Sequence, residues 1–375
     1  MSEPRQHWKN ALRAAFGALL LVWIFHSIFV NEARVQARRP EGLFTPDGQR
    51  VNWDDSLPRL QQWRCGWRYG PPALASKLRS AEPASCVIAF ALMGGMLFLG
   101  VLRWQIVLRV HGLELPLGQA TQLSLIAHFF NAFLLGTAGG DVVKAYYAAQ
   151  ETHHKKTEAV VTVFVDRIIG LWAMLLFGGV MILPNYQLFG RPGLLRTAAA
   201  VLVAMLAAAS AFMFLALRGG VSRAWPGARH WLRRLPKGER VEQVLDSCRI
   251  FGQSPRFLPR TLGLSILINL LMVWQFIVLA RGLHLAPPPG ALYLVVPVVI
   301  CISALPISPS GLGVRENLFV HLLAVPAIGV PETGALSLSL LAYAMSLAWS
   351  VIGGLLYVTR KDRRRLREVA QGEES

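Results

Sequence analysis

The chain has 375 residues, of which 54% are hydrophobic and only 16% are charged. This profile is typical of a polytopic membrane protein and unlike that of two soluble domains. The formal net charge of +17 should therefore lie in loops, where it orients the chain and meets anionic headgroups rather than nucleic acid. The sequence has no GxxxxGK or HExxH motif, and its four cysteines form no CxxC pattern. We therefore expect no nucleic-acid partner, no metal site and no cofactor.

The first apolar run extends from about residue 11 to residue 30 and follows the basic residues Arg5 and Lys9. It is longer than the ~7–15-residue apolar core of a signal peptide, so we expect an uncleaved first span. A signal peptide is the alternative, because Val35-Gln36-Ala37 has the small-residue pattern of a cleavage site.

Residues 31–83 are predicted to form an extracytoplasmic insertion. Thr45-Pro46-Asp47-Gly48 is a turn signal and indicates a small hairpin. The tryptophans at 53, 63 and 67 either pack this cap or lie at the membrane interface. Cys65 and Cys86 either form a disulfide or remain two free thiols.

Five further apolar segments are predicted to cross the membrane. Arg103 and Arg109 lie near the end of the first of these and are expected to snorkel to the interface. Residues 218–260 carry ten Lys/Arg against three acids and are predicted to be an amphipathic surface segment. Six more basic residues follow between Arg360 and Arg367. The five segments are about 84–108, 168–183, 195–217, 261–280 and 335–358.

The positive-inside rule places both termini and residues 218–260 in the cytoplasm. This topology requires 118–140 and 291–328 each to enter and leave on one side of the membrane. The predicted fold is therefore an all-α polytopic membrane protein with six full spans and two opposed re-entrant helical hairpins, a pattern consistent with an inverted repeat. The predicted organisation is 1–30 as a cytoplasmic stub and first span, 31–83 as the insertion, 84–358 as the membrane core and 359–375 as a basic cytoplasmic tail.

Both predicted hairpins contain glycines followed by charges. One reads Gly139-Gly140-Asp141-Val142-Val143-Lys144 and the other Gly311-Leu312-Gly313-Val314-Arg315-Glu316. Glycine lets backbone amides approach a ligand, and a helix N-terminus favours an anion. Opposed broken helices in the two halves of a membrane protein indicate a transport site near the midplane. Two structural alternatives remain: Asp141 and Lys144 as a surface pair one turn apart, and Asp166-Arg167 as the interface end of a span.

Residues 136–146 with Val165-Asp166-Arg167, and residues 305–316, resemble the integral membrane region of the lysylphosphatidylglycerol synthase/flippase family. The resemblance covers roughly residues 84–358. It implies a lipid flippase or translocase of the bacterial inner membrane, acting on aminoacylated phospholipids, other phospholipids or polyprenyl-linked glycans. Three departures are that Lys144 stands where the family usually has arginine, that the segment 31–83 is inserted, and that no soluble aminoacyl-transferase domain follows the membrane region within these 375 residues.

We therefore expect a transporter of an anionic amphiphile, and not an enzyme, in the bacterial inner membrane. Lys144, Arg167 and Arg315 would neutralise phosphate. Asp141, Asp166 and Glu316 would position those cations, or bind a cationic headgroup or a proton. The other predicted substrate-binding residues are Asn131, which either lines the cavity or joins two helices, and Gly139, Gly140, Ser308, Gly311 and Gly313.

Two other classes remain open. One is a membrane transferase acting on lipid-linked donors, and the other is a non-transporting scaffold for a lipid synthase. The expected partners are membrane lipids and a separate lipid synthase or glycosyltransferase.

Overall fold

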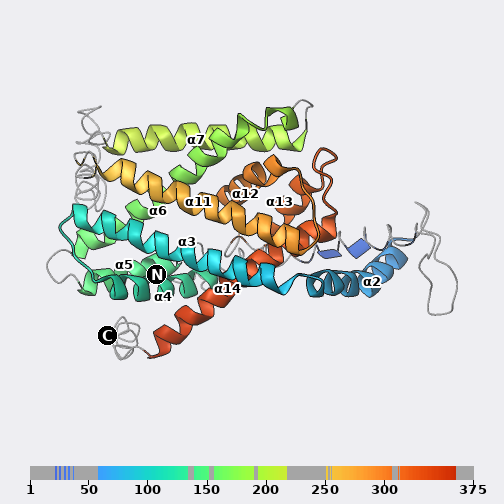
Figure 1. Ribbon diagram of the computed structural model, residues 1–375, viewed down its shortest axis with the longest axis horizontal. Helices are drawn as coiled ribbons and strands as arrows, with labels where there is room; N and C mark the ends of the chain where they lie inside the picture. The colour runs from blue at the N-terminus through green and yellow to red at the C-terminus, as the bar shows by residue number, and fades with distance from the viewer. Residues whose placement is uncertain are drawn as a thin grey trace, which may run out of the picture. The chain divides into compact units, whose positions relative to one another are not determined.

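The computed structural model of the chain is shown in Figure 1. It describes residues 58–133, 139–151, 156–189, 193–217, 256–305 and 313–359, with isolated positions between 22 and 37 and at 251, 254 and 311. All regular structure in these residues is helical, which confirms the predicted all-α class. Most of the predicted first span, the turn at 45–48, most of 218–260 and the basic tail lie outside the described residues.

Among the described residues, five helices are long and apolar enough to cross a membrane, and each overlaps one of the six predicted spans. The shortest has 24 residues and the longest have 28. At 1.5 Å per residue these lengths are about 36–42 Å, more than the ~30 Å of a hydrocarbon core. The five are α3 (Pro83–Val110), α6 (Lys156–Ile182), α7 (Leu194–Leu217), α11 (Phe257–Gly282) and α14 (Glu332–Thr359).

Four shorter helices lie in or directly after the two segments predicted to be re-entrant: α4 (Leu117–Phe133), α5 (Gly139–Glu151), α12 (Pro289–Ser303) and α13 (Val314–Leu323). Three lie within or nearly within these segments, but α5 begins at Gly139 and so lies almost wholly beyond the predicted end of 118–140. The four helices have 17, 13, 15 and 10 residues, fewer than the ~20 needed to cross a membrane. The first two pack against each other, and so do the last two. The segment 291–328 therefore contains a pair of packed short helices, whereas the pair α4 and α5 extends beyond 118–140 to Glu151. Entry and exit on one side of the membrane remain a prediction for both pairs.

A helix not expected from the sequence, α2 (Arg59–Arg79), lies in the predicted insertion and contains Pro71 and Pro72. It packs on helical residues between 22 and 37 through small side chains. A Cβ at Gly70 would lie 2.2 Å from the ring of Phe29, so only glycine permits this approach. The mixture of Pro, Gly and Trp in this segment resembles a loop, and sequence spacing alone does not show the packing partner that stabilises a helix here.

The two cysteines near this helix are both free thiols, so Cys65 and Cys86 do not form the disulfide that the sequence left open. Cys65 packs instead with Tyr69 against the buried Ala33 and Ala37.

The chain divides into two compact units. We call residues 1–90 and 275–344 the first unit, and residues 91–274 and 345–375 the second unit. The divisions fall within α3, α11 and α14. Among the shorter helices, α2, α12 and α13 belong to the first unit, whereas α4 and α5 belong to the second.

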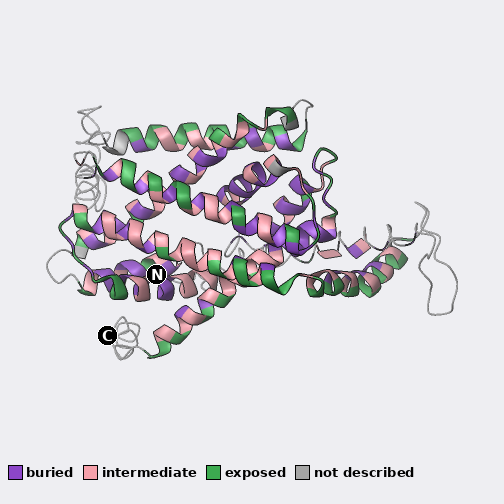
Figure 2. Cartoon of the chain, viewed as in Figure 1, coloured by how far each residue is buried: buried purple, intermediate pink, exposed green. Residues whose placement is uncertain are grey.

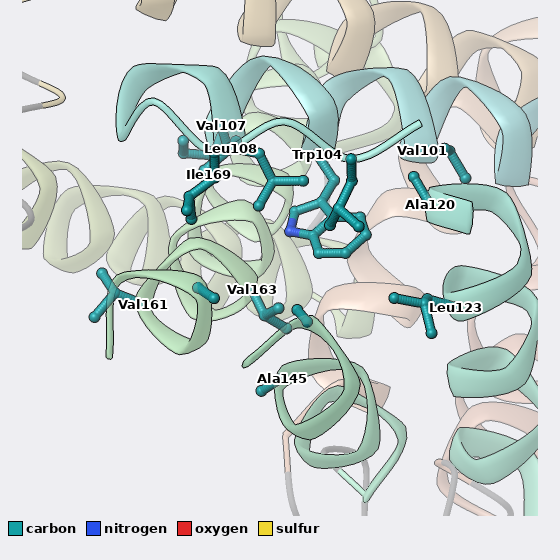
Figure 3. Packing of buried hydrophobic residues seen from close by; sticks show 14 of the residues in the cluster. Val101, Trp104, Val107, Leu108, Ala120, Leu123, Ala145, Val161, Val163 and Ile169 are labelled. Atoms are coloured by element: carbon teal, nitrogen blue, oxygen red, sulfur yellow. The ribbon is translucent and has the colours of Figure 1, made fainter. Parts of the chain in front are cut away.

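The core of the second unit is built around Trp104 of α3, whose side chain is completely buried. Figure 3 shows its indole among apolar side chains from α3, α4, α5 and α6. The indole Nε1 donates a hydrogen bond to Thr162 Oγ1 at 3.3 Å, which satisfies its polar atom. In the first unit, the rings of Phe276 and Phe319 stack with centroids 4.9 Å apart.

Large apolar side chains are exposed along α7, as the green surface of this helix in Figure 2 indicates. Val201, Val203, Phe212 and Phe214 are each more than two-fifths exposed. Such a surface is unfavourable in water but favourable against lipid chains, so it agrees with a membrane-spanning helix.

Close backbone contact in the second unit depends on Gly353 of α14. A Cβ at this position would lie 2.0 Å from the carbonyl oxygen of Leu125 on α4. Because backbone atoms cannot move aside as a flexible side chain can, we expect Gly353→Ala to destabilise the protein by about 1–3 kcal/mol. Gly263 of α11 has nothing within 4 Å of such a Cβ, so Gly263→Ala is the matched control. It should be neutral or stabilising by up to about 1 kcal/mol. Thermal unfolding in detergent measures both; equal midpoints for the two variants would contradict the close contact.

Candidate functional site

An ion pair between Arg103 of α3 and Asp166 of α6 is central to the charged region of the second unit. The guanidinium Nε and Nη2 donate to the two carboxylate oxygens at 2.8 and 3.2 Å, and Nη1 donates to Ser265 Oγ of α11 at 2.9 Å. The side chains are only 12% and 11% exposed. The expectation that Arg103 snorkels to the interface is therefore wrong, because this bidentate pair satisfies its charge within the protein.

The space for this guanidinium is provided by Gly170, one turn after Asp166 on α6. A Cβ at Gly170 would lie 2.9 Å from both terminal nitrogens of Arg103. A larger residue here would push the guanidinium away from the carboxylate.

A second ion pair joins α6 to α5. Arg167 Nη1 donates to Asp141 Oδ2, so the adjacent residues Asp166 and Arg167 bind partners on two different helices. Asp141 is the third residue of α5 and thus also lies where the helix dipole favours a negative charge. Asp141 and Lys144 do not form the surface pair that was one alternative reading, because Lys144 is buried.

Lys144 is a cation without a carboxylate in contact. Its Nζ lies 3.9 Å from the centroid of the Trp104 ring, a cation–π contact. The residue is only 9% exposed, and among the described residues no carboxylate oxygen lies within 4 Å of Nζ. The carboxylates of Asp141 and Asp166 attract it only from a greater distance. We call these residues and their partners the lysine cluster: Arg103, Asp141, Lys144, Asp166 and Arg167.

Asn131 and Gly140 form the contact that holds the start of α5 to α4. The Gly140 N–H donates to Asn131 Oδ1 at 2.8 Å, and a Cβ at Gly140 would lie 1.9 Å from the Ala127 carbonyl oxygen. The helix-joining alternative for Asn131 is therefore the one that the structure shows. Gly139 is the first residue of α5 and is half-buried.

A different charged group lies in the first unit, at the start of α13. Glu316 is completely buried, and its carboxylate accepts hydrogen bonds from the Gly313 N–H at 2.7 Å, from Arg315 Nε at 3.0 Å and from Ser339 Oγ at 3.5 Å. The guanidinium carbon of Arg315 lies 4.3 Å from the centroid of the Tyr343 ring. We call this set the arginine–glutamate cluster.

The chain enters α13 through glycines with a left-handed backbone. Gly311 has a φ of +70° and Gly313 a φ of +82°, values that favour glycine. A Cβ at Gly311 would lie 3.0 Å from both the Cβ and the carbonyl oxygen of Ser303, at the end of α12. Ser308 lies outside the described residues.

The structure thus places the charged residues of the predicted site in two clusters, one in each unit. Sequence reasoning missed the partners that hold these charges: Arg103, Trp104, Ser265, Ser339 and Tyr343. A signal for Arg103 was present, because a cation inside a 28-residue apolar helix requires a partner or an exit to water.

Five apolar helices of spanning length and buried, paired charges define a multi-pass helical membrane protein. Residues 60–354 match a protein family that is described as the lysylphosphatidylglycerol synthase TM region. The match covers more than half of the chain, so the protein belongs to this lipid-related membrane family, as its motifs indicated. A comparison with curated proteins found no match.

The Arg103–Asp166 pair leads to a prediction about stability. Arg103→Met or Asp166→Leu alone leaves an unpartnered charge in a low-dielectric site, so each should destabilise the protein by about 3–5 kcal/mol. The double variant removes both charges and should be more stable than either single variant. Thermal unfolding in detergent measures the stability of the parent, the two single variants and the double variant. Arg109→Met, at an exposed cation on the same helix, is the control and should be nearly neutral. Additive losses in the double variant would show that the pair is not coupled.

Proposed function

We propose that this protein is a lipid translocase of the bacterial inner membrane. It moves a phospholipid with an anionic or aminoacylated headgroup, or a polyprenyl-phosphate-linked lipid, from one leaflet to the other. The observation that carries this proposal is Lys144, a buried cation with no carboxylate in contact among the described residues.

Charge is unbalanced in the lysine cluster. It contains three cations and two carboxylates, and both carboxylates are already paired with arginines. One net positive charge therefore remains in a region of low dielectric, where it is unfavourable unless a counter-ion is present. A phosphodiester carries one negative charge and is common to all the proposed substrates, so it is the natural counter-ion.

The geometry also favours an order of contact. Four side chains of the lysine cluster form ion pairs. Arg167 is the most exposed of these four, with 28% of its side chain accessible. Its pairing with Asp141 involves one nitrogen, which leaves other N–H donors for an incoming headgroup. The phosphate would meet Arg167 first and then Lys144, while the acyl or polyprenyl tails stay in the bilayer. Lys144 binds as a point charge and adapts to different headgroups more readily than a rigid guanidinium fork.

The arginine–glutamate cluster is a separate candidate phosphate contact within the first unit. Arg315 is paired with Glu316 and lies over Tyr343, but a guanidinium has five N–H donors and the contacts with Glu316 do not use them all. Glu316 is fully occupied by its own hydrogen bonds, so we assign it to holding Arg315 and the start of α13 rather than to binding substrate.

Replacing Lys144 tests the proposal directly. Lys144→Met keeps the length of the side chain but removes the charge, and loss of one charged hydrogen bond of about 1.5–3 kcal/mol should slow lipid transfer by roughly 10- to 100-fold. The measurement is scrambling of a fluorescent phosphatidylglycerol in liposomes containing the purified protein. Because the charge is restored, Lys144→Arg should recover part of the rate. Arg109→Met should keep the parent rate, since this cation lies outside both clusters.

Three outcomes of the same assay would contradict the proposal. Parent-rate scrambling by Lys144→Met would show that the lysine is structural. Formation of a new lipid product, without scrambling by the parent protein, would indicate a membrane transferase. Activity of neither kind would favour a scaffold for a separate lipid synthase or glycosyltransferase.

The proposed topology gives a further prediction. With the four native cysteines replaced, Arg50→Cys should react with a membrane-impermeant maleimide in intact cells. Arg240→Cys and Ala370→Cys should react only after the membrane is opened, because basic segments remain in the cytoplasm. Labelling of position 50 only in opened cells would invert the topology and contradict the assignment.

A further inference from the structure

The exposed face of α2 is not used by the proposed transport site. Three large apolar side chains lie on it with helical spacing: Leu60 is 62% exposed, Trp63 50% and Trp67 38%. They are separated by three and four residues, so they share one side of the helix. In Figure 2 the ribbon of this helix alternates between exposed residues and intermediate or buried ones.

Basic side chains border this apolar strip. Arg64 and Arg68 each follow a tryptophan directly and are exposed, as is Arg79. The helix contains five basic residues and no acid over its 21 positions. A surface with tryptophans beside arginines is complementary to a bilayer interface that carries negative headgroups.

The face of α2 that adjoins this strip is already occupied, and Trp67 lies at the border of the two. Gly66 and Gly70 lie against Val30 and Phe29, and the ring of Trp67 meets that of Phe29 edge-on with centroids 5.3 Å apart. The Trp67 indole Nε1 also bonds His26 Nδ1 at 3.2 Å. This contact fixes the rotation of the helix about its axis, so that Leu60 and Trp63 remain on the outer side.

The end of α2 is held at the boundary of two candidate spans. Only residues 80–82 separate α2 from Pro83, where α3 begins. The Glu82 N–H donates to the carbonyl oxygen of Gly282, the last residue of α11, at 3.0 Å. Since one candidate spanning helix begins and another ends at this point, we expect this end of α2 to lie at the level of the lipid headgroups.

We infer that α2 is an interfacial helix that binds the surface of an anionic phospholipid bilayer. Leu60, Trp63 and Trp67 enter the boundary between headgroups and acyl chains, and Arg64 and Arg68 bind phosphate groups beside them. This binding is independent of headgroup transfer at the lysine cluster. It predicts that α2 rests on the membrane only when anionic lipid is present.

Spin-label accessibility in lipid nanodiscs tests this inference on the full chain. Nitroxides are attached to Trp63→Cys and, as the matched control on the opposite side of the same helix, to Ser76→Cys, each in a protein whose native cysteines are replaced. In phosphatidylglycerol-containing discs the label at 63 should collide with oxygen and be shielded from a water-soluble nickel chelate. The label at 76 should remain accessible to the chelate. In purely zwitterionic discs the label at 63 should become accessible to the chelate as well.

Charge reversal separates electrostatic binding from simple apolar contact. Arg64→Glu with Arg68→Glu, added to the Trp63→Cys protein, should shift the equilibrium from lipid toward water by roughly tenfold or more in anionic discs. Three results would overturn the inference: a label at 63 accessible to the nickel chelate in anionic discs, a label shielded from both reagents because protein covers it, or equal insertion in both lipids. The first measurement needs no charge variant, so a folding defect of the double reversal does not prevent the test.

Discussion

Charges inside an apolar helical protein must be neutralised by neighbours, and the second unit is organised by this requirement. Arg103 and Asp166 connect α3 to α6, and Arg167 and Asp141 connect α6 to α5. Ser265 adds α11 through its hydrogen bond with Arg103. Four helices are thus joined by polar contacts whose loss would leave unpaired charge, whereas apolar packing alone permits small rotations of one helix against another. Lys144 is different, because it lies among these pairs without a carboxylate of its own in contact. The same requirement that explains the two ion pairs therefore also underlies our proposal that this position binds an anion from outside the protein.

These polar contacts form only because glycine residues leave space for the groups to approach each other. Gly170 leaves room for the Arg103 guanidinium, and Gly140 lets the start of α5 approach the Ala127 carbonyl of α4. In each case a methyl group would displace either a charged side chain or a backbone atom. Gly140 also donates its amide to Asn131, so its role in the structure is to join two helices. The sequence analysis assigned such glycines to ligand approach, but the same lack of a side chain serves helix packing equally well, and only the neighbouring atoms distinguish the two uses.

Much of the fold could be predicted because apolar length and charge are local properties of the sequence. In the described residues, five apolar helices of spanning length overlap predicted spans, and two pairs of short helices lie in or directly after the segments predicted to be re-entrant. Partners of buried charges could not be predicted in the same way. The sequence shows that Arg103 lies near the end of a span, and for this reason it was assigned to the interface. Its partner Asp166 is 63 residues away, so no local pattern connects the two. Asp141 was considered as a partner of Lys144 because spacing shows which residues share a helix face, but it does not show that Arg167 of the next helix lies closer. The helix α2 was missed for a related reason: the residues that pack on Gly66 and Gly70 come from a separate part of the chain.

The two glycine-rich motifs look alike in sequence yet differ in electrostatics. Each places an acid at the third residue of a helix, Asp141 in α5 and Glu316 in α13. Glu316 accepts hydrogen bonds from the Gly313 N–H at the start of its own helix and from the adjacent Arg315. The two opposite charges therefore neutralise each other within a few residues of the chain. Asp141 instead binds Arg167 on another helix, which leaves Lys144, one turn further along α5, without a carboxylate in contact. The excess positive charge at Lys144 therefore arises because Asp141 pairs with Arg167. It does not depend on the number of charges in the motif. For the same reason Lys144, rather than Arg315, is the residue at which loss of charge should affect an anionic ligand most.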